Sequence, residues 1–233
     1  MALAAPVRSI TEFTLGRTDG PTLVYLDVAI ADEPPRRLRI ELFDEELPYT
    51  TTNFRLLCTG ERKGNAKVRA LWYKQSRFHR IVPGFMMQGG DITHGNGAGG
   101  APAYSRAFED EVRLIARSMI MGQLTHPLYT QHQVGSVSMA HQNNSNKSQF
   151  FISFLPVRDF RTRFSRLPLT SSAPQASWCD GKHVVFGQVL HEDLPHLSAF
   201  ESVGSASGRP LKPVVVVDCG QLSGDGYTPV AAT

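Results

Sequence analysis

A permanent cation stands beside apolar and sulfur-bearing side chains in the segment SRFHRIVPGFMMQGGD, residues 76–91. Arg80 keeps its charge at every physiological pH, and Phe85, Met86 and Gln88 follow a few residues later. Because a charged side chain is rarely buried without a partner, we expect Arg80 to face a cleft that these neighbours line. Methionine suits an irregular apolar wall. The segment predicts a non-covalent site for an apolar ligand next to a cation.

The same residue types also have a plainer interpretation. Phe85, Met86 and Phe151 could belong to a barrel core, because large apolar residues are usually buried. His183, in the segment DGKHVVFG, could cap a strand, and Trp178 could anchor an exposed loop. The residue types alone leave both interpretations open.

Three other kinds of chemistry lack support in the sequence. The segment GNGAGG, residues 95–100, matches the dinucleotide-binding pattern, but Pro102 interrupts the helix that a bound phosphate needs. The eight histidines form no HxxxH or HExxH unit, so neither a metal nor another cofactor is predicted. The GxSxG segment of a nucleophile elbow is absent as well. Nucleotide binding, metal catalysis and covalent catalysis are therefore not expected.

The elements that must position these residues are mostly short strands. Segments 22–31 and 37–43 alternate apolar and polar residues and are joined by a proline-containing turn, which predicts a hairpin. One amphipathic helix follows, with Pro48 near its start and Gly60 as its stop, and a second short helix is expected near residues 194–200. Many short strands and few helices favour a closed β-barrel. Further apolar segments lie at 78–82, 85–90, 135–140, 148–154, 183–190 and 213–220.

Composition indicates one globular domain with long loops. The chain has 233 residues, of which 41% are hydrophobic and 19% charged, and its net charge of +3 is too small to indicate a nucleic-acid partner. No apolar run is long enough to cross a membrane, and three widely spaced cysteines favour a reducing compartment, cytoplasmic or nuclear. The expected parts are an extension 1–20, a domain 21–222 with insertions at 62–71, 113–133 and 156–176, and a tail 223–233.

Three segments together resemble one family. FHRIVPGFMMQGGD, MAHQNNSNKSQFFI and WCDGKHVVFGQVL closely resemble the cyclophilin family of peptidyl-prolyl cis/trans isomerases, and the resemblance runs from about Pro21 to Leu222. It implies an all-β dominated fold, a closed eight-stranded antiparallel barrel capped by two α-helices. It also implies rotation about X–Pro bonds, in protein folding or conformational switching, with Arg80 as the catalytic group. The substrate-binding residues that it implies are Phe85, Met86, Gln88, Gly97, Ala140, His141, Gln142, Gln149, Phe151, Trp178, Cys179 and His183.

The chain departs from the family pattern at three of these positions. Where the family usually has Ala-Asn-Ala, this chain has Ala140, His141 and Gln142, and the bulkier Gln142 should narrow the neighbouring subsite. Cys179 replaces the usual leucine and removes apolar wall from the proline pocket. We expect the isomerase chemistry to persist with weaker affinity. The family resemblance also implies that Trp178 binds a cyclosporin-type ligand, here more weakly.

Proline-containing peptides and proteins are the expected partners. An alternative function is a proline-peptide binding module that acts as a scaffold with weak catalysis. The loop Pro156–Ala176, with four arginines among phenylalanines, is a candidate surface for a protein partner. RNA contact through the same arginines lacks an aromatic-interleaved motif, so neither nucleic acid nor membrane is predicted as a partner.

Overall fold

The computed structural model describes residues 21–65, 68–111, 134–141, 143–154, 183–223, 226 and 228–230. The extension 1–20, the insertions 113–133 and 156–176, and three predicted site residues lie outside the described residues. Those site residues are Gln142, Trp178 and Cys179.

The chain begins with the predicted hairpin and helix. β1 (Leu23–Ile30) pairs antiparallel with β2 (Arg36–Leu42), and each strand alternates core and outer residues. α1 (Pro48–Thr59) follows, with proline in its first turn, where a missing N–H costs nothing. Gly60 ends the helix in the left-handed conformation, with φ 68°, and its N–H donates to the Leu56 carbonyl.

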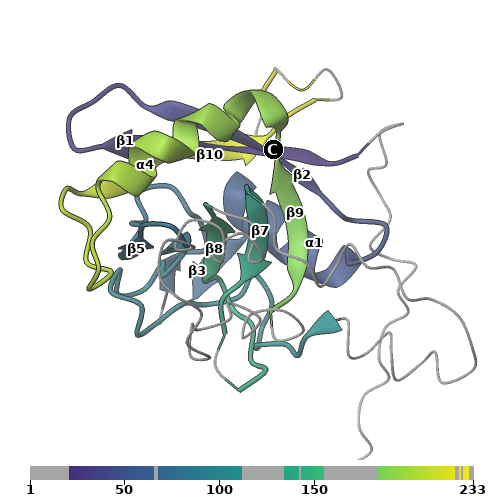
Figure 1. Ribbon diagram of the computed structural model, residues 1–233. Coiled ribbons are helices and arrows are strands. Elements are labelled where there is room, and N and C mark those ends of the chain that lie inside the picture. The colour runs from purple at the N-terminus through teal and green to yellow at the C-terminus, as the bar shows by residue number, and fades with distance from the viewer. Residues whose placement is uncertain are drawn as a thin grey trace, which may run out of the picture.

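Eight strands form one antiparallel sheet in the order β10-β1-β2-β9-β7-β8-β6-β5. Figure 1 shows the sheet curling, with β1 and β10 across the top of the view and β7, β8 and β9 turning down beneath them. The predicted insertion at 62–71 contains a separate two-stranded sheet. The remaining strands are β3 (Lys63–Asn65), β4 (Val68–Ala70), β5 (Arg80–Val82), β6 (Met86–Gly89), β7 (Ser136–Met139), β8 (Phe150–Ser153), β9 (Val185–Val189) and β10 (Val214–Gln221).

The predicted closed barrel is confirmed only in part, as a curled sheet of eight antiparallel strands with two α-helices. The strand ladder ends at β5 on one side and at β10 on the other. Three hydrogen bonds nevertheless connect β10 to the segment just ahead of β5. Gln75 N–H donates to Val216 O at 2.7 Å, Val216 N–H to Ser76 O at 3.0 Å, and Phe78 N–H to Val214 O at 2.9 Å.

The hydrophobic core lies on the inner side of the curled sheet and is covered by α1. Phe54 of this helix is fully buried, and its ring lies 4.9 Å from the Phe186 ring and 5.1 Å from the Phe150 ring, centroid to centroid. The helix packs against β10, β1 and β9. Asn53, also fully buried, accepts from Ala103 N–H and donates to Lys147 O, so the helix holds two loops in place.

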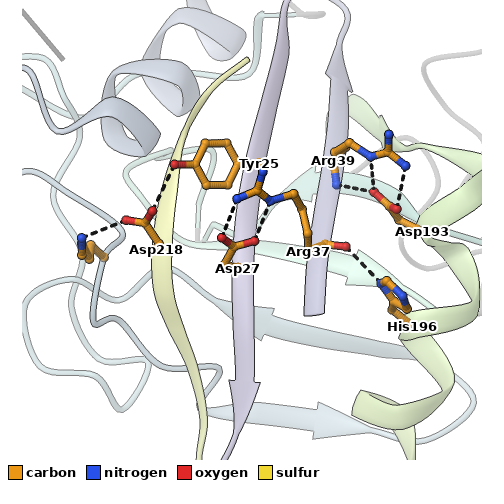
Figure 2. Close-up of polar contacts among 8 residues, drawn as sticks. Tyr25, Asp27, Arg37, Arg39, Asp193, His196 and Asp218 are labelled. Carbon is orange, nitrogen blue, oxygen red and sulfur yellow. Dashed lines mark hydrogen bonds and ion pairs between the residues drawn. The ribbon is translucent and has the colours of Figure 1, made fainter. Parts of the chain in front are cut away.

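The second helical region begins as a 3₁₀ turn, η4 (His191–His196), and continues as α4 (Leu197–Ser202). It starts earlier and ends later than the helix predicted near 194–200. Figure 2 shows how polar contacts fix it to the outer face of the sheet. Arg39 of β2 donates twice from its guanidinium and once from its backbone to Asp193, at 2.8–2.9 Å, and His196 contacts the Arg37 carbonyl at 3.1 Å. Among the described helices, none has the length and hydropathy needed to cross a bilayer.

Candidate functional site

A row of directly opposed residues crosses three strands on the outer face of the sheet. Arg80 of β5 is opposite Gln88 of β6, and Gln88 is opposite Phe151 of β8. Because opposed residues in antiparallel strands share a face, these three side chains lie on one side. Met86 shares that side, since it lies two residues before Gln88 on the same strand. We call Arg80, Met86, Gln88 and Phe151 the Arg80 face.

The register separates this face from the core. Phe150 and Phe151 are adjacent in sequence and point to opposite sides of β8, and only Phe150 belongs to the central apolar cluster. Met86 and Met87 divide in the same way on β6. Met86 and Phe151 are buried, at 2% and 5% exposure, yet they do not line the core. Both residues are therefore buried on the side of their strands that faces away from the central apolar cluster.

Phe85 has a different setting from its neighbour Met86. It lies in the turn between β5 and β6, where its N–H donates to Val82 O and its carbonyl accepts from Phe154 N–H. The turn is tied to α4, because Glu201 accepts from the Gly84 N–H at 2.7 Å. The structure thus places Phe85 in the turn next to Met86, outside the opposed row.

Arg80 is exposed, and within the described ranges its guanidinium forms no hydrogen bond or ion pair. The loop after α4 supports its side chain. A Cβ atom at Gly208 would lie 3.0 Å from Arg80 Cγ and 3.3 Å from Arg80 Nε, and Gly208 O accepts from Ile81 N–H at 2.8 Å. The side chain is held along its stem while its charged end stays available to a ligand.

Two glutamines link the Arg80 face to the glycine-rich loop. Gln88 Nε2 donates to Gln149 Oε1 at 3.0 Å, and Gln149 Nε2 donates to the carbonyls of Gly97 and Gly99, each at 2.8 Å. The predicted site residues Gln88, Gln149 and Gly97 are therefore brought together. Gly97 has φ 91°, and a Cβ there would lie 2.7 Å from His79 Nε2, so only glycine fits.

The glycine-rich loop folds around an internal anion. The carboxylate of Asp91 accepts from the N–H groups of Thr93, His94, Asn96, Gly97 and Gly99 and from the Thr93 hydroxyl, at 2.9–3.2 Å. Burial alone would raise the pKa of Asp91, but these hydrogen bonds outweigh it and hold the pKa well below its usual range. The backbone N–H groups of this loop thus donate to the carboxylate of Asp91, in place of a bound phosphate. Sequence reasoning missed Asp91, although an aspartate directly ahead of a glycine loop is a turn signal.

Two histidines meet at the other end of the Arg80 face. The His183 ring lies edge-on to the Phe151 ring, with centroids 5.5 Å apart, and the His141 ring lies 4.9 Å from His183. His183 Nδ1 is 3.0 Å from Met139 O, and since a carbonyl only accepts, that nitrogen carries the proton. The predicted site residues His141 and His183 therefore converge on Phe151. Ala140 lies beside them, and its N–H donates to Gln149 O at 2.9 Å.

His141 is turned inward toward a carboxylate that sequence reasoning did not select. Its Nε2 lies 3.2 Å from Asp110 Oδ2, and the two side chains are only 9% and 8% exposed. Asn146 Nδ2 donates to the other Asp110 oxygen at 2.8 Å. Burial raises the pKa of Asp110, while the hydrogen bonds from His141 and Asn146 lower it by more, so the carboxyl pKa falls below its usual range.

This arrangement suits a ligand with an apolar ring next to a hydrogen-bond acceptor. Phe151 and Met86 are apolar side chains on the same face as Arg80, whose exposed guanidinium carries rigid donors. In the described part of the chain, no group of three or more His, Cys, Asp or Glu side chains is placed to hold a metal ion. A cation next to apolar side chains can bind such a ligand and stabilise negative charge or a lone pair on it.

Comparison with known families agrees with the geometry. The family model described as cyclophilin type peptidyl-prolyl cis-trans isomerase/CLD matches residues 25–221, which is most of the chain. The matched range contains every predicted site residue, including those outside the described residues. The chain belongs to the cyclophilin-type peptidyl-prolyl cis-trans isomerase family.

Proposed function

We propose that this chain is an active peptidyl-prolyl isomerase that acts on exposed X–Pro segments, with Arg80 as the catalytic group. The observation that carries the proposal is the position of the Arg80 guanidinium. It is exposed and supported along its stem, and it lies on the same face as Phe151 and Met86. Membership of the family supports isomerase activity in general, and this geometry supports it for this chain.

The reaction has a barrier of about 18–20 kcal/mol, because rotation breaks the resonance of the peptide bond. In the twisted transition state the prolyl nitrogen regains its lone pair and can accept a hydrogen bond. An arginine donor beside that nitrogen stabilises the twisted state and not the planar one, so it lowers the barrier by differential binding. No nucleophile or proton transfer is required.

The apolar residues of the Arg80 face would hold the proline ring while the preceding carbonyl rotates. Phe151 offers a ring that is itself fixed edge-on by His183, and Met86 adds an adaptable side chain next to it. Gln88 is tied to Gln149 and would orient the peptide backbone. Rigid walls of this kind reduce the entropy lost when the peptide is held in a reactive geometry.

The direct test is cis/trans exchange of the peptide Ala-Ala-Pro-Phe, measured by NMR. Wild type should accelerate exchange, and Arg80→Ala should lower kcat/KM at least about tenfold, or about 1.4 kcal/mol of transition-state stabilisation. The matched control is Arg77→Ala, which removes an exposed arginine from the same segment. A folded Arg80→Ala protein with wild-type exchange rates would refute the electrostatic mechanism, and would leave a proline-peptide binding module as the better description.

Several finer properties remain proposals. We expect weak binding of a cyclosporin-type ligand through Trp178, which calorimetry can test, and client selection by the loop Pro156–Ala176. A reducing, cytoplasmic location is likewise a prediction from the cysteine pattern. We also propose that the curled sheet closes into a barrel, an idea supported by the hydrogen bonds between residues 75–78 and β10.

A further inference from the structure

His141 and Asp110 form a buried pair next to His183, at the Phe151 end of the Arg80 face. The Asn144 N–H donates to His141 Nδ1 at 3.2 Å, so that nitrogen carries no proton. The ring proton therefore lies on Nε2, which faces Asp110 Oδ2. The side-chain oxygen of Asn144 accepts from the Asp110 N–H at 2.7 Å. Asn144, His141 and Asp110 therefore form a closed ring of hydrogen bonds. Asp110 and the Asn144 N–H thus contact the two nitrogens of the His141 ring and specify its tautomer.

The loop that carries His141 depends on the same carboxylate. Asp110 also accepts from Asn146 Nδ2, so two donors from residues 141–146 converge on its two oxygens. Asn143 and Asn144 have φ values of 55° and 56°, a left-handed conformation that asparagine tolerates better than most residues. Such a loop needs firm attachment, and a buried acceptor with two charge-assisted hydrogen bonds supplies it.

A chain of ring contacts leads from this pair to the Arg80 face. The His141 ring lies against the His183 ring at 4.9 Å with a 49° tilt, and the His183 ring meets the Phe151 ring edge-on at 5.5 Å. His183 is fixed on its other side by Met139 O. A shift of His141 would remove a ring that packs against His183, and His183 in turn packs against the Phe151 ring, which we call the Phe151 wall.

We propose that Asp110 is a positioning residue for peptide binding, which acts through His141 on His183 and so on the Phe151 wall. The proposal rests on the proposed function, since it assigns Phe151 to the ring-binding surface. It also assigns His141 a supporting role, in which its ring packs inward instead of contacting substrate. Asp110 touches no reacting atom, so its loss should affect KM and leave kcat nearly unchanged.

Asp110→Asn is the informative variant. Both carboxylate oxygens accept from a donor, so an amide at this position must turn its NH₂ toward either His141 or Asn146. We expect KM for Ala-Ala-Pro-Phe to rise about threefold to tenfold, with kcat within about twofold of wild type. Glu109→Gln, which removes the neighbouring exposed carboxylate, is the matched control and should leave both constants unchanged.

A double variant tests whether Asp110 acts through His141. In His141→Ala the ring is gone, so an asparagine at position 110 can turn its NH₂ into the vacated space and still accept from Asn146. Asp110→Asn should then add less than about twofold to the KM of His141→Ala. If the two effects multiply, or if neither variant changes KM, the proposal is wrong. Should Asp110→Asn fail to fold, His141→Ala alone must raise KM by a similar factor.

Histidine NMR separates this proposal from the proposed function. Long-range ¹H–¹⁵N spectra of the wild type should show His141 protonated on Nε2 and His183 on Nδ1, and Asp110→Asn should shift the His183 ring signals. If the wild type does not accelerate exchange at all, the proposed function fails, while these spectra still decide whether Asp110 positions His183. Unchanged His183 signals in Asp110→Asn would overturn the positioning role whatever the activity.

Discussion

At the scale of single residues, Asp91 converts a sequence that resembles a phosphate loop into an internal structural element. Five backbone N–H groups and one hydroxyl donate to its carboxylate, and its pKa is held well below the usual range. A carboxylate with a depressed folded-state pKa adds stability above its unfolded pKa of about 4, and that stability is lost as the pH falls toward the folded pKa.

We therefore predict that Asp91→Asn lowers the free energy of unfolding by about 2 kcal/mol at pH 7, because the amide cannot accept all of these hydrogen bonds. The difference from wild type should narrow when urea unfolding is repeated at pH 3. Asp32→Asn, which changes an exposed aspartate, serves as the control and should differ little from wild type at either pH. An equal deficit at both pH values would mean that the ionised carboxylate is not the stabilising species.

At the scale of elements, the loop after α4 both covers the edge of β5 and supports Arg80. Ser205 N–H donates to Ile81 O at 3.2 Å, and Ile81 N–H donates to Gly208 O at 2.8 Å, so the edge strand is paired. Gly208 has φ 83°, and its missing side chain leaves room for the stem of Arg80. The loop thus packs closely against the side chain of Arg80.

Gly208→Ala should push Arg80 from its position and lower kcat/KM for Ala-Ala-Pro-Phe about threefold to tenfold, since small displacements of a catalytic group are costly. In the Arg80→Ala background, the same substitution should have almost no further effect. Gly226→Ala controls for backbone strain, because Gly226 has φ 71° and, among the described residues, a new Cβ would meet the flexible end of Leu23 at 3.2 Å. Equal losses of kcat/KM in both backgrounds would show that Gly208 does not act through Arg80.

At the scale of the whole molecule, the proposed closure of the sheet makes a specific prediction about hydrogen exchange. If residues 75–78 and β10 form a true seam, the amides of Gln75, Phe78 and Val216 should exchange only through global unfolding, like those of central strands. Native-state exchange followed by NMR in low urea checks this. Exchange of these three amides at a much lower free energy than the Phe150 and Ile152 amides of β8 would indicate an open edge.

The sequence by itself determined the local elements and the family. Apolar alternation indicated the first two strands and short apolar runs the other strands of the large sheet, while Pro48 and Gly60 bounded the helix. Three motif segments indicated the cyclophilin-type domain that the family comparison confirmed. These features are readable because each depends on a residue's own backbone preferences or on neighbours a few positions away. The assignment of Phe150 to the core and Phe151 to the outer face required the strand register.

Only the tertiary structure decided which distant residues support the site. Asp110 against His141, Gly208 beneath Arg80 and Asp91 within its loop have partners chosen by how the chain folds back on itself. An isolated aspartate or glycine looks alike in sequence whether it faces solvent or a buried donor, because its role depends on burial and partner geometry. Local sequence patterns contain no information on burial or on the geometry of distant partners. The supporting residues could therefore be identified only from the assembled fold.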